Sequence, residues 1–168
     1  MRNSKGFTLL ELVIVIFIIS LAAAIILPRL PASNNSDLKS SAVSTATMLR
    51  YLGERSVTSN IKYRLHINVS DSTIKVTQVS NTGEESTPDD PFFSKKFISG
   101  DTQIADIETP RLGKITEGET IFDFGPAGLT EFLTIHFKTP DGKTFYTVAA
   151  FPNTGKVKIL EGNQELSL

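Results

Sequence analysis

Residues 6–28 read GFTLLELVIVIFIISLAAAIILP, an almost uninterrupted apolar stretch. Between residues 7 and 27 it carries one charge, Glu11, in a run of about 21 residues, long enough for a helix to cross a bilayer. Arg2 and Lys5 precede the stretch, and the positive-inside rule keeps this end in the cytoplasm. The sequence therefore predicts a single-pass membrane protein whose remaining residues lie across the membrane.

Glu11 is the unusual residue of this stretch. A carboxylate inside a membrane helix costs roughly 2.5–3.5 kcal/mol on insertion scales, and such residues usually have a partner. An ordinary secretory signal is an alternative, because Ala22-Ala23-Ala24 could serve as its cleavage site. However, Glu11 interrupts the apolar region, and the apolar run continues to Leu27 after the alanines. A plain membrane anchor, the second alternative, would leave Glu11 unexplained.

Residues 5–11, Lys-Gly-Phe-Thr-Leu-Leu-Glu, resemble the signature of type IV pilins and type II secretion pseudopilins. In that superfamily a prepilin peptidase cuts after the glycine and methylates the new N-terminal phenylalanine. The resemblance implies that Gly6 is the last residue of the leader and Phe7 the mature N-terminus. It also implies that Glu11 serves assembly.

The same resemblance divides the chain into three parts. Residues 1–6 would be the prepilin leader, residues 7–28 the transmembrane and assembly helix, and residues 29–168 a periplasmic pilin-like domain. Pro28 would kink the helix, since proline removes a backbone donor and crowds the preceding turn. The expected location is the bacterial inner membrane, with the N-terminus cytoplasmic and the C-terminal domain periplasmic.

Composition limits the function of the domain. The chain has 168 residues, so the part beyond the membrane helix suits one compact domain. Its formal net charge is −1, which does not favour broad nucleic-acid binding. It contains no cysteine, which excludes thiol catalysis, cysteine-ligated metals and cysteine redox chemistry.

A second helix is predicted over about residues 36–59, with Asn35 or Ser36 as its cap. Apolar residues there recur at steps of four and three, which is typical of an amphipathic helix packed on a sheet of its own domain. The predicted buried stripe is Leu38, Ala42, Thr45, Leu49 and Leu52.

After residue 60 the apolar period changes from that of a helix to that of a strand. Residues 63–69 alternate between apolar and polar, and residues 74–76 continue a partner strand after a turn. Residues 133–137, 143–151 and 157–159 form three further strands linked by tight turns, which predicts an antiparallel meander. The expected fold class is α+β: a long N-terminal helix, its first half membrane-spanning and its second half amphipathic, packed on antiparallel β-sheets.

The region between these strand groups is less regular. Residues 80–91 form a polar loop whose four acidic residues could suggest calcium, but their spacing matches no EF-hand, so a solvated loop is expected. Apolar residues at 92–98 return to the core, and residues 99–119 are expected to form short strands and turns.

The sequence favours no enzyme. The two histidines, His66 and His136, lie on the polar sides of predicted strands, where surface positions are expected. No Ser/His/Asp set, phosphate-binding glycine loop or zinc-ligand spacing is recognisable. We therefore expect no catalytic residue, cofactor, metal or small-molecule ligand.

The C-terminal region resembles a narrower family. Residues 124–128, Phe-Gly-Pro-Ala-Gly, and residues 154–158, Thr-Gly-Lys-Val-Lys, are similar to the GspH/FimT family of minor pseudopilins and minor pilins. The resemblance implies an H-type minor pseudopilin at or near the tip of the type II secretion pseudopilus, which exports proteins across the outer membrane. Its partners would be the other major and minor pseudopilins and the prepilin peptidase.

The alternative is a type IV minor pilin that acts in pilus assembly or in DNA binding and uptake. Some FimT-like proteins bind DNA through a basic C-terminal glycine motif, and Lys156 and Lys158 would be the corresponding contacts here. A solvated strand edge that discourages aggregation explains the same two lysines. Because the domain is not basic, nucleic-acid binding is not the expected function.

Overall fold

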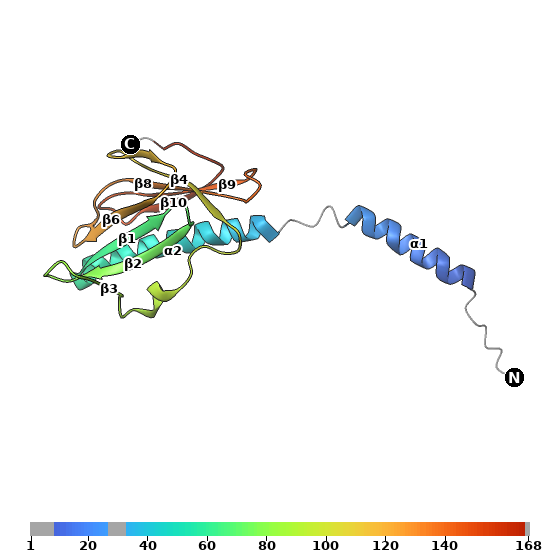
Figure 1. Ribbon diagram of the computed structural model, residues 1–168, viewed down its shortest axis with the longest axis horizontal. Helices are drawn as coiled ribbons and strands as arrows, with labels where there is room; N and C mark the ends of the chain where they lie inside the picture. The colour runs from blue at the N-terminus through green and yellow to red at the C-terminus, as the bar shows by residue number, and fades with distance from the viewer. Residues whose placement is uncertain (1–8, 27–32, 167–168) are drawn as a thin grey trace. The chain divides into compact units, whose positions relative to one another are not determined.

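The computed structural model describes residues 9–26 and 33–166 (Figure 1). The chain divides into two units, residues 1–32 and 33–168. The first contains helix α1, Leu9–Ile26, whose residues are apolar on every side except at Glu11 and Ser20. In the described part of the chain, no helix combines the length and the apolarity needed to cross a bilayer.

Helix α2, Ser33–Ser59, opens the second unit. It begins three residues before the predicted start, so Asn35 and Ser36 lie in its first turn and do not cap it. Two of its buried hydroxyls are satisfied within the helix: Ser41 donates to the Asp37 carbonyl and Ser56 to the Gly53 carbonyl. The predicted stripe is buried, with exposed fractions of 0–2%: Leu38, Ala42, Thr45, Leu49 and Leu52.

The first sheet, sheet A, has the strand order β3-β2-β1-β6-β7. All of its pairs are antiparallel. Its strands are β1 (Lys62–Asn68), β2 (Thr73–Val79), β3 (Glu85–Ser86), β6 (Glu119–Gly125) and β7 (Gly128–Leu129). The predicted alternation in β1 is confirmed, because Tyr63, Leu65 and Ile67 are buried between more exposed neighbours.

The second sheet, sheet B, has the order β10-β9-β8-β4-β5 and is also antiparallel. Its strands are β4 (Gln103–Thr109), β5 (Gly113–Ile115), β8 (Leu133–Lys138), β9 (Phe145–Ala150) and β10 (Val157–Glu161). The predicted C-terminal meander is confirmed as β8-β9-β10. The register of the β4–β8 pair shifts between Ile104 and Asp106.

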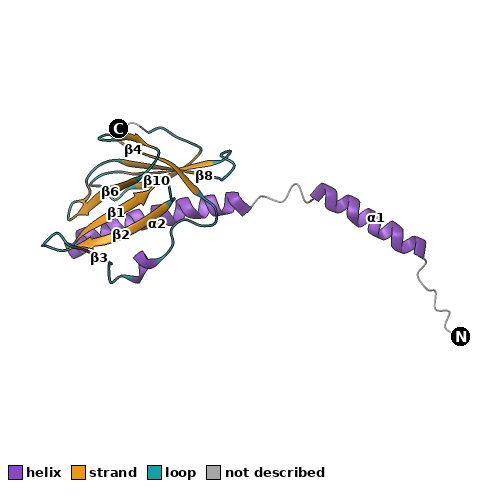
Figure 2. Cartoon of the chain, in the orientation of Figure 1, coloured by secondary structure: helices purple, strands orange, loops and turns teal. Residues whose placement is uncertain are grey.

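Helix α2 packs against both sheets, with its most extensive contacts on β9 and β10 and further contacts on β6 and β7. Figure 2 shows the helix running past strands of both sheets. One hydrophobic core joins the helix stripe to the inner faces of the sheets, through residues such as Leu65, Phe122, Ile135 and Phe137. The predicted class, a helix packed on antiparallel sheets, is confirmed.

Part of the connection from sheet A to sheet B packs against α2. A 3-10 helix, η2 (Pro91–Ser94), begins where Asp90 accepts a hydrogen bond from the Phe92 amide. Tyr51 of α2 donates its hydroxyl to the same carboxylate. Phe93, Phe97 and Ile98 are buried, as expected. The predicted loop 80–91 is therefore not wholly solvated: it also contains β3, which pairs with β2.

Gly100 lies so close to Asp37, the fifth residue of α2, that a substitution there tests this packing. Its φ is +56°, and a Cβ built there would lie 2.8 Å from Cγ of Asp37. Gly83 is a matched control, with φ of +87° and open space around the same position. Gly100→Ala should lower stability more than Gly83→Ala, by about 1 kcal/mol or more, because only Gly100→Ala adds a steric clash to the cost of left-handed backbone.

The measurement is thermal and urea unfolding of the full-length chain in detergent micelles. Asp37→Ala added to Gly100→Ala should recover most of the difference, since it removes the obstructing carboxylate. Equal losses from the two glycine variants would contradict the proposed close packing.

Candidate functional site

Of the residues that the motif points to, the structure describes one. Gly6, Phe7 and Pro28 lie outside the described residues. Glu11 lies in the first turn of α1, and its side chain is exposed. The processing, assembly and kink roles of these residues therefore stay predictions.

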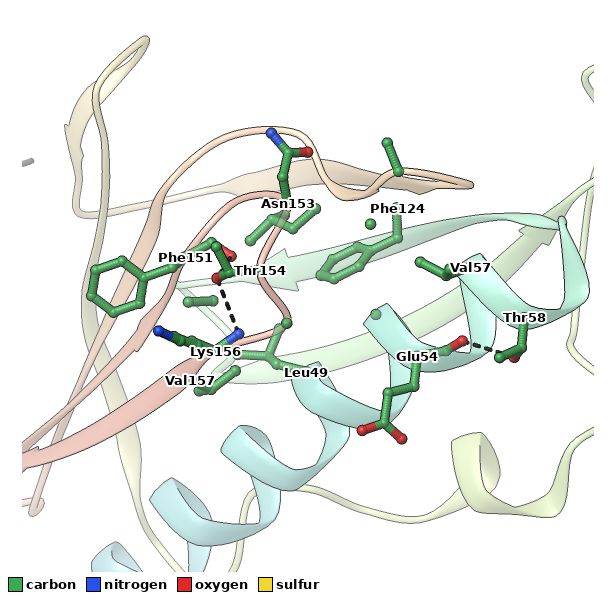
Figure 3. Close-up of a pocket in the computed structure, with 16 residues that line it drawn as sticks. Leu49, Glu54, Val57, Thr58, Phe124, Phe151, Asn153, Thr154, Lys156 and Val157 are labelled. Carbon is green, nitrogen blue, oxygen red and sulfur yellow. Dashed lines mark hydrogen bonds between the residues drawn. The ribbon is translucent and has the colours of Figure 1, made fainter.

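The domain has a cavity of about 440 Å³ at the C-terminal half of α2. Residues from the helix, from β6 and β7 of sheet A and from the β9–β10 turn of sheet B surround it (Figure 3). Its walls are mainly apolar, and they include Leu49, Val57, Phe124, Leu129, Ala150 and Val157. The sheet edges β7 and β10 both contact α2, so the cavity lies where the two sheets meet the helix.

The β9–β10 turn, residues 151–156, forms one wall. The Phe151 amide donates to the Lys156 carbonyl at 2.9 Å, and the Asn153 amide donates to the Leu129 carbonyl at 3.2 Å. The second bond joins the turn of sheet B to β7 of sheet A. The turn needs left-handed backbone at Asn153 (φ 56°) and Gly155 (φ 64°), residue types that adopt it readily.

Lys156 and Lys158 lie beside this wall. Lys156 is exposed and lines the cavity, and its amide donates to the Thr154 hydroxyl at 3.2 Å. The Lys158 ammonium lies 5.4 Å from the centroid of the Phe151 ring, a cation–π contact. The sequence identified both lysines but not the cavity, because its two glycine-containing turns carry no signal that they meet at the same helix.

The cavity carries few charged groups. Among its described lining residues the charged ones are Glu54 and Lys156. No group of histidine, aspartate and glutamate in the described residues is arranged to hold a metal ion. An apolar recess with a few polar groups at its rim is the kind of surface that receives an apolar side chain or segment of another molecule.

Charge is concentrated elsewhere, on the face of sheet A that carries Arg64 and His66. Arg64 bridges Glu85 at 2.6 Å and Asp123 at 3.1 Å, and His66 bonds Glu85 at 2.9 Å. The pKa of Glu85 is lowered to about 2, first by the hydrogen bond from Arg64 and then by the bond from Thr77, which together outweigh burial. These pairs fasten β3 to the sheet and largely neutralise one another.

The prediction that His136 lies at the surface is wrong. Its side chain is fully buried, and Nδ1 lies 2.6 Å from Oδ1 of Asp106. Strand alternation placed it correctly on the polar face of β8, but the chain after β10 crosses that face and covers it. His66 is also largely covered, with 14% of its side chain exposed, by the carboxylates that contact it.

Comparison with known proteins identifies the N-terminal motif and the fold. Residues 1–27 match the prokaryotic N-terminal methylation motif. No curated protein matches the chain. The minor pseudopilin EpsH from the type 2 secretion system of Vibrio cholerae is similar in structure, with a TM-score of 0.58, 19% identity, and coverage of 74% of this chain and 97% of EpsH.

The type IV minor pilin FimU of Pseudomonas aeruginosa (strain PAO1) aligns with a TM-score of 0.48 and 14% identity, over 77% of this chain and 92% of FimU. At such identity, the likeness to EpsH shows the fold alone. The methylation motif and that fold agree with the sequence resemblance, so the resemblance to the type IV pilin-like superfamily is confirmed.

Proposed function

We propose that this chain is a minor pseudopilin, a structural subunit at or near the tip of a type II secretion pseudopilus that exports proteins across the outer membrane. The observation that carries the proposal is that one chain combines a methylation motif at residues 1–27 with a following domain that has the fold of EpsH. Residues 7–28 anchor the subunit in the inner membrane, with the domain in the periplasm. Its partners are prepilin peptidase and the other pseudopilins.

In this proposal the protein works mechanically. The apolar helix is held in the membrane until the subunit is extracted, and then packs with the helices of other subunits. The cavity beside α2 receives part of a neighbouring pilin-like subunit, which would shield its apolar walls from water. No step requires a cofactor, a metal or a bond-making residue.

A type IV minor pilin is the alternative within the same superfamily. A role in DNA uptake has less support, because Lys156 and Lys158 are two exposed lysines on a chain of net charge −1, and Glu54 lines the same cavity as Lys156. Deleting the gene should abolish protein secretion and leave twitching and DNA uptake at wild-type levels. Loss of twitching or DNA uptake with intact secretion would overturn the secretion proposal.

Two N-terminal variants should separate processing from assembly. Gly6→Leu should retain the leader, because a bulky residue would obstruct the cut site. Glu11→Leu should be processed to methylated Phe7 but should assemble poorly, since the proposed role of its carboxylate is to contact the N-terminal amine of a neighbouring subunit and so select the stagger between helices. Mass spectrometry reads the N-terminus, and photo-crosslinking to neighbouring subunits reads assembly.

Wild-type crosslinking by Glu11→Leu would contradict the assembly role of the carboxylate. An N-terminus near Ala24 would instead indicate an ordinary secretory signal.

The proposed role of the cavity as a subunit contact can be tested with substitutions on α2. Val57 lines it and is 52% exposed, so Val57→Glu should leave stability within about 0.5 kcal/mol of wild type. Because a charge would have to be desolvated on docking, the same variant should reduce subunit crosslinking and secretion several-fold in the deletion strain. Val43→Glu is the matched control, on the same helix, 44% exposed and outside the cavity. Equal losses from both variants would show that the cavity is not the contact.

A further inference from the structure

The face of sheet B that carries His136 holds a row of polar residues paired across three strands. Asp106 of β4 is the register partner of His136 on β8, and His136 is the partner of Thr147 on β9. All three are buried, with exposed fractions of 4%, 0% and 0%. Buried polar groups in such a row must find hydrogen-bond partners within the protein.

A C-terminal strap, residues 162–164, supplies partners for this row. The Thr147 hydroxyl donates to the Gly162 carbonyl at 2.7 Å and accepts from the Gln164 amide at 3.0 Å. The Gln164 carbonyl lies 3.2 Å from Nε2 of His136. The Gly162 amide also donates to the Phe145 carbonyl of β9 at 2.8 Å. The start of the strap is therefore held on β9 by this backbone bond and by the Thr147 hydroxyl, and its Gln164 end is held by the Thr147 hydroxyl and by the imidazole on β8.

Both neighbours of the His136 ring are acceptors. Nδ1 faces the Asp106 carboxylate, and Nε2 faces a backbone carbonyl, which cannot donate. A neutral imidazole carries one proton, so it would leave one ring nitrogen with its lone pair against an acceptor oxygen. Only the imidazolium, with a proton on each nitrogen, satisfies both contacts.

A third charged group contacts the Asp106–His136 pair. Asp106 also binds the Lys114 ammonium of β5 at 3.3 Å, so this carboxylate is shared between two cations. The register partner on β9 is uncharged, and the strap presents its backbone. The remaining charged residues on these elements, at neighbouring positions, are Glu108 on β4, Lys138 on β8 and Glu165 after the strap.

We propose that His136 is a buried imidazolium that latches the Gln164 end of the C-terminal strap onto sheet B, and that loss of its proton releases that end. The proton that leaves is the one on Nε2, since the Nδ1 proton is held by a carboxylate. The Gln164 carbonyl then faces a lone pair at the same distance, and the contact becomes repulsive. Release uncovers the Asp106–His136–Thr147 row for solvent or for another molecule.

The direction of the pH dependence follows from the two groups. Burial by itself lowers the pKa of His136, but the hydrogen bonds with Asp106 and the Gln164 carbonyl and the charge of Asp106 outweigh it, so the pKa is raised. The latch is thus fully closed below the ordinary histidine pKa of about 6.5 and opens as pH rises through the higher folded value.

At acid pH, protonation of the Asp106 carboxylate limits how firmly the strap is held. Burial raises the pKa of Asp106, while the bond and charge of His136, and then Lys114, outweigh burial and lower it. Its contribution is therefore present above about pH 3.9 and is lost as pH falls through the lowered value. The strap should be most firmly held between these two limits.

The test is NMR of the full-length, 15N-labelled chain in detergent micelles between pH 5 and pH 10. Ring-nitrogen correlations of His136 should show two protonated nitrogens at pH 6. As Nε2 loses its proton, the heteronuclear NOE of the Gln164 amide should fall toward the value of a free chain terminus. His66→Gln, the control at the other histidine, should leave this transition unchanged.

Two further variants bear on the mechanism. His136→Gln should remove the alkaline transition of Gln164. Thr147→Val should free Gln164 at every pH, because it removes the hydroxyl that accepts from the Gln164 amide. It should also lower the His136 pKa, because the Gln164 carbonyl no longer accepts from Nε2. This variant keeps the test valid if His136→Gln fails to fold. A His136 ring with one bare nitrogen at pH 6 would overturn the proposal. So would a Gln164 NOE that stays constant while His136 titrates.

Discussion

The structure depends on one constraint, the burial of a single helix against two sheets. The stripe that includes Leu38, Leu49 and Leu52 loses essentially all contact with water, and apolar burial of this kind is the main favourable term in folding. Because α2 packs against both sheets, their edge strands β7 and β10 come to the same end of the helix. The cavity forms there as a consequence of how the core closes.

The polar faces of the two sheets differ in how far they are exposed to water. Sheet A leaves Arg64 and its carboxylate partners partly in water, where opposite charges need little further support. Sheet B buries Asp106 and His136, for which desolvation is costly unless every polar atom is paired. The strap after β10 completes that pairing. The strap is therefore one of the elements that stabilise the buried charges of sheet B.

The proposed function is that of a protein that works through its surfaces. Several ionisable groups in the described part of the domain form ion pairs, such as Arg64 with Glu85 and Asp106 with His136, and no group of histidine, aspartate and glutamate there is arranged to hold a metal ion. The cavity beside α2 has mainly apolar walls. Together with an N-terminal methylation motif, that combination supports a subunit whose role is to be positioned among neighbours, with specificity decided by shape and by the charges at the rim.

Local patterns determined much of this protein from sequence alone. The motif at residues 5–11, the helix stripe and the β8–β10 meander are periodic or contiguous, so each could be predicted without knowing the fold. The cavity and the environment of His136 could not, because both depend on segments distant in sequence: β7 meets the β9–β10 turn, and residue 164 covers β8. Alternation says which face of a strand a side chain occupies. Only the tertiary structure decides whether that face meets water or another segment of the chain.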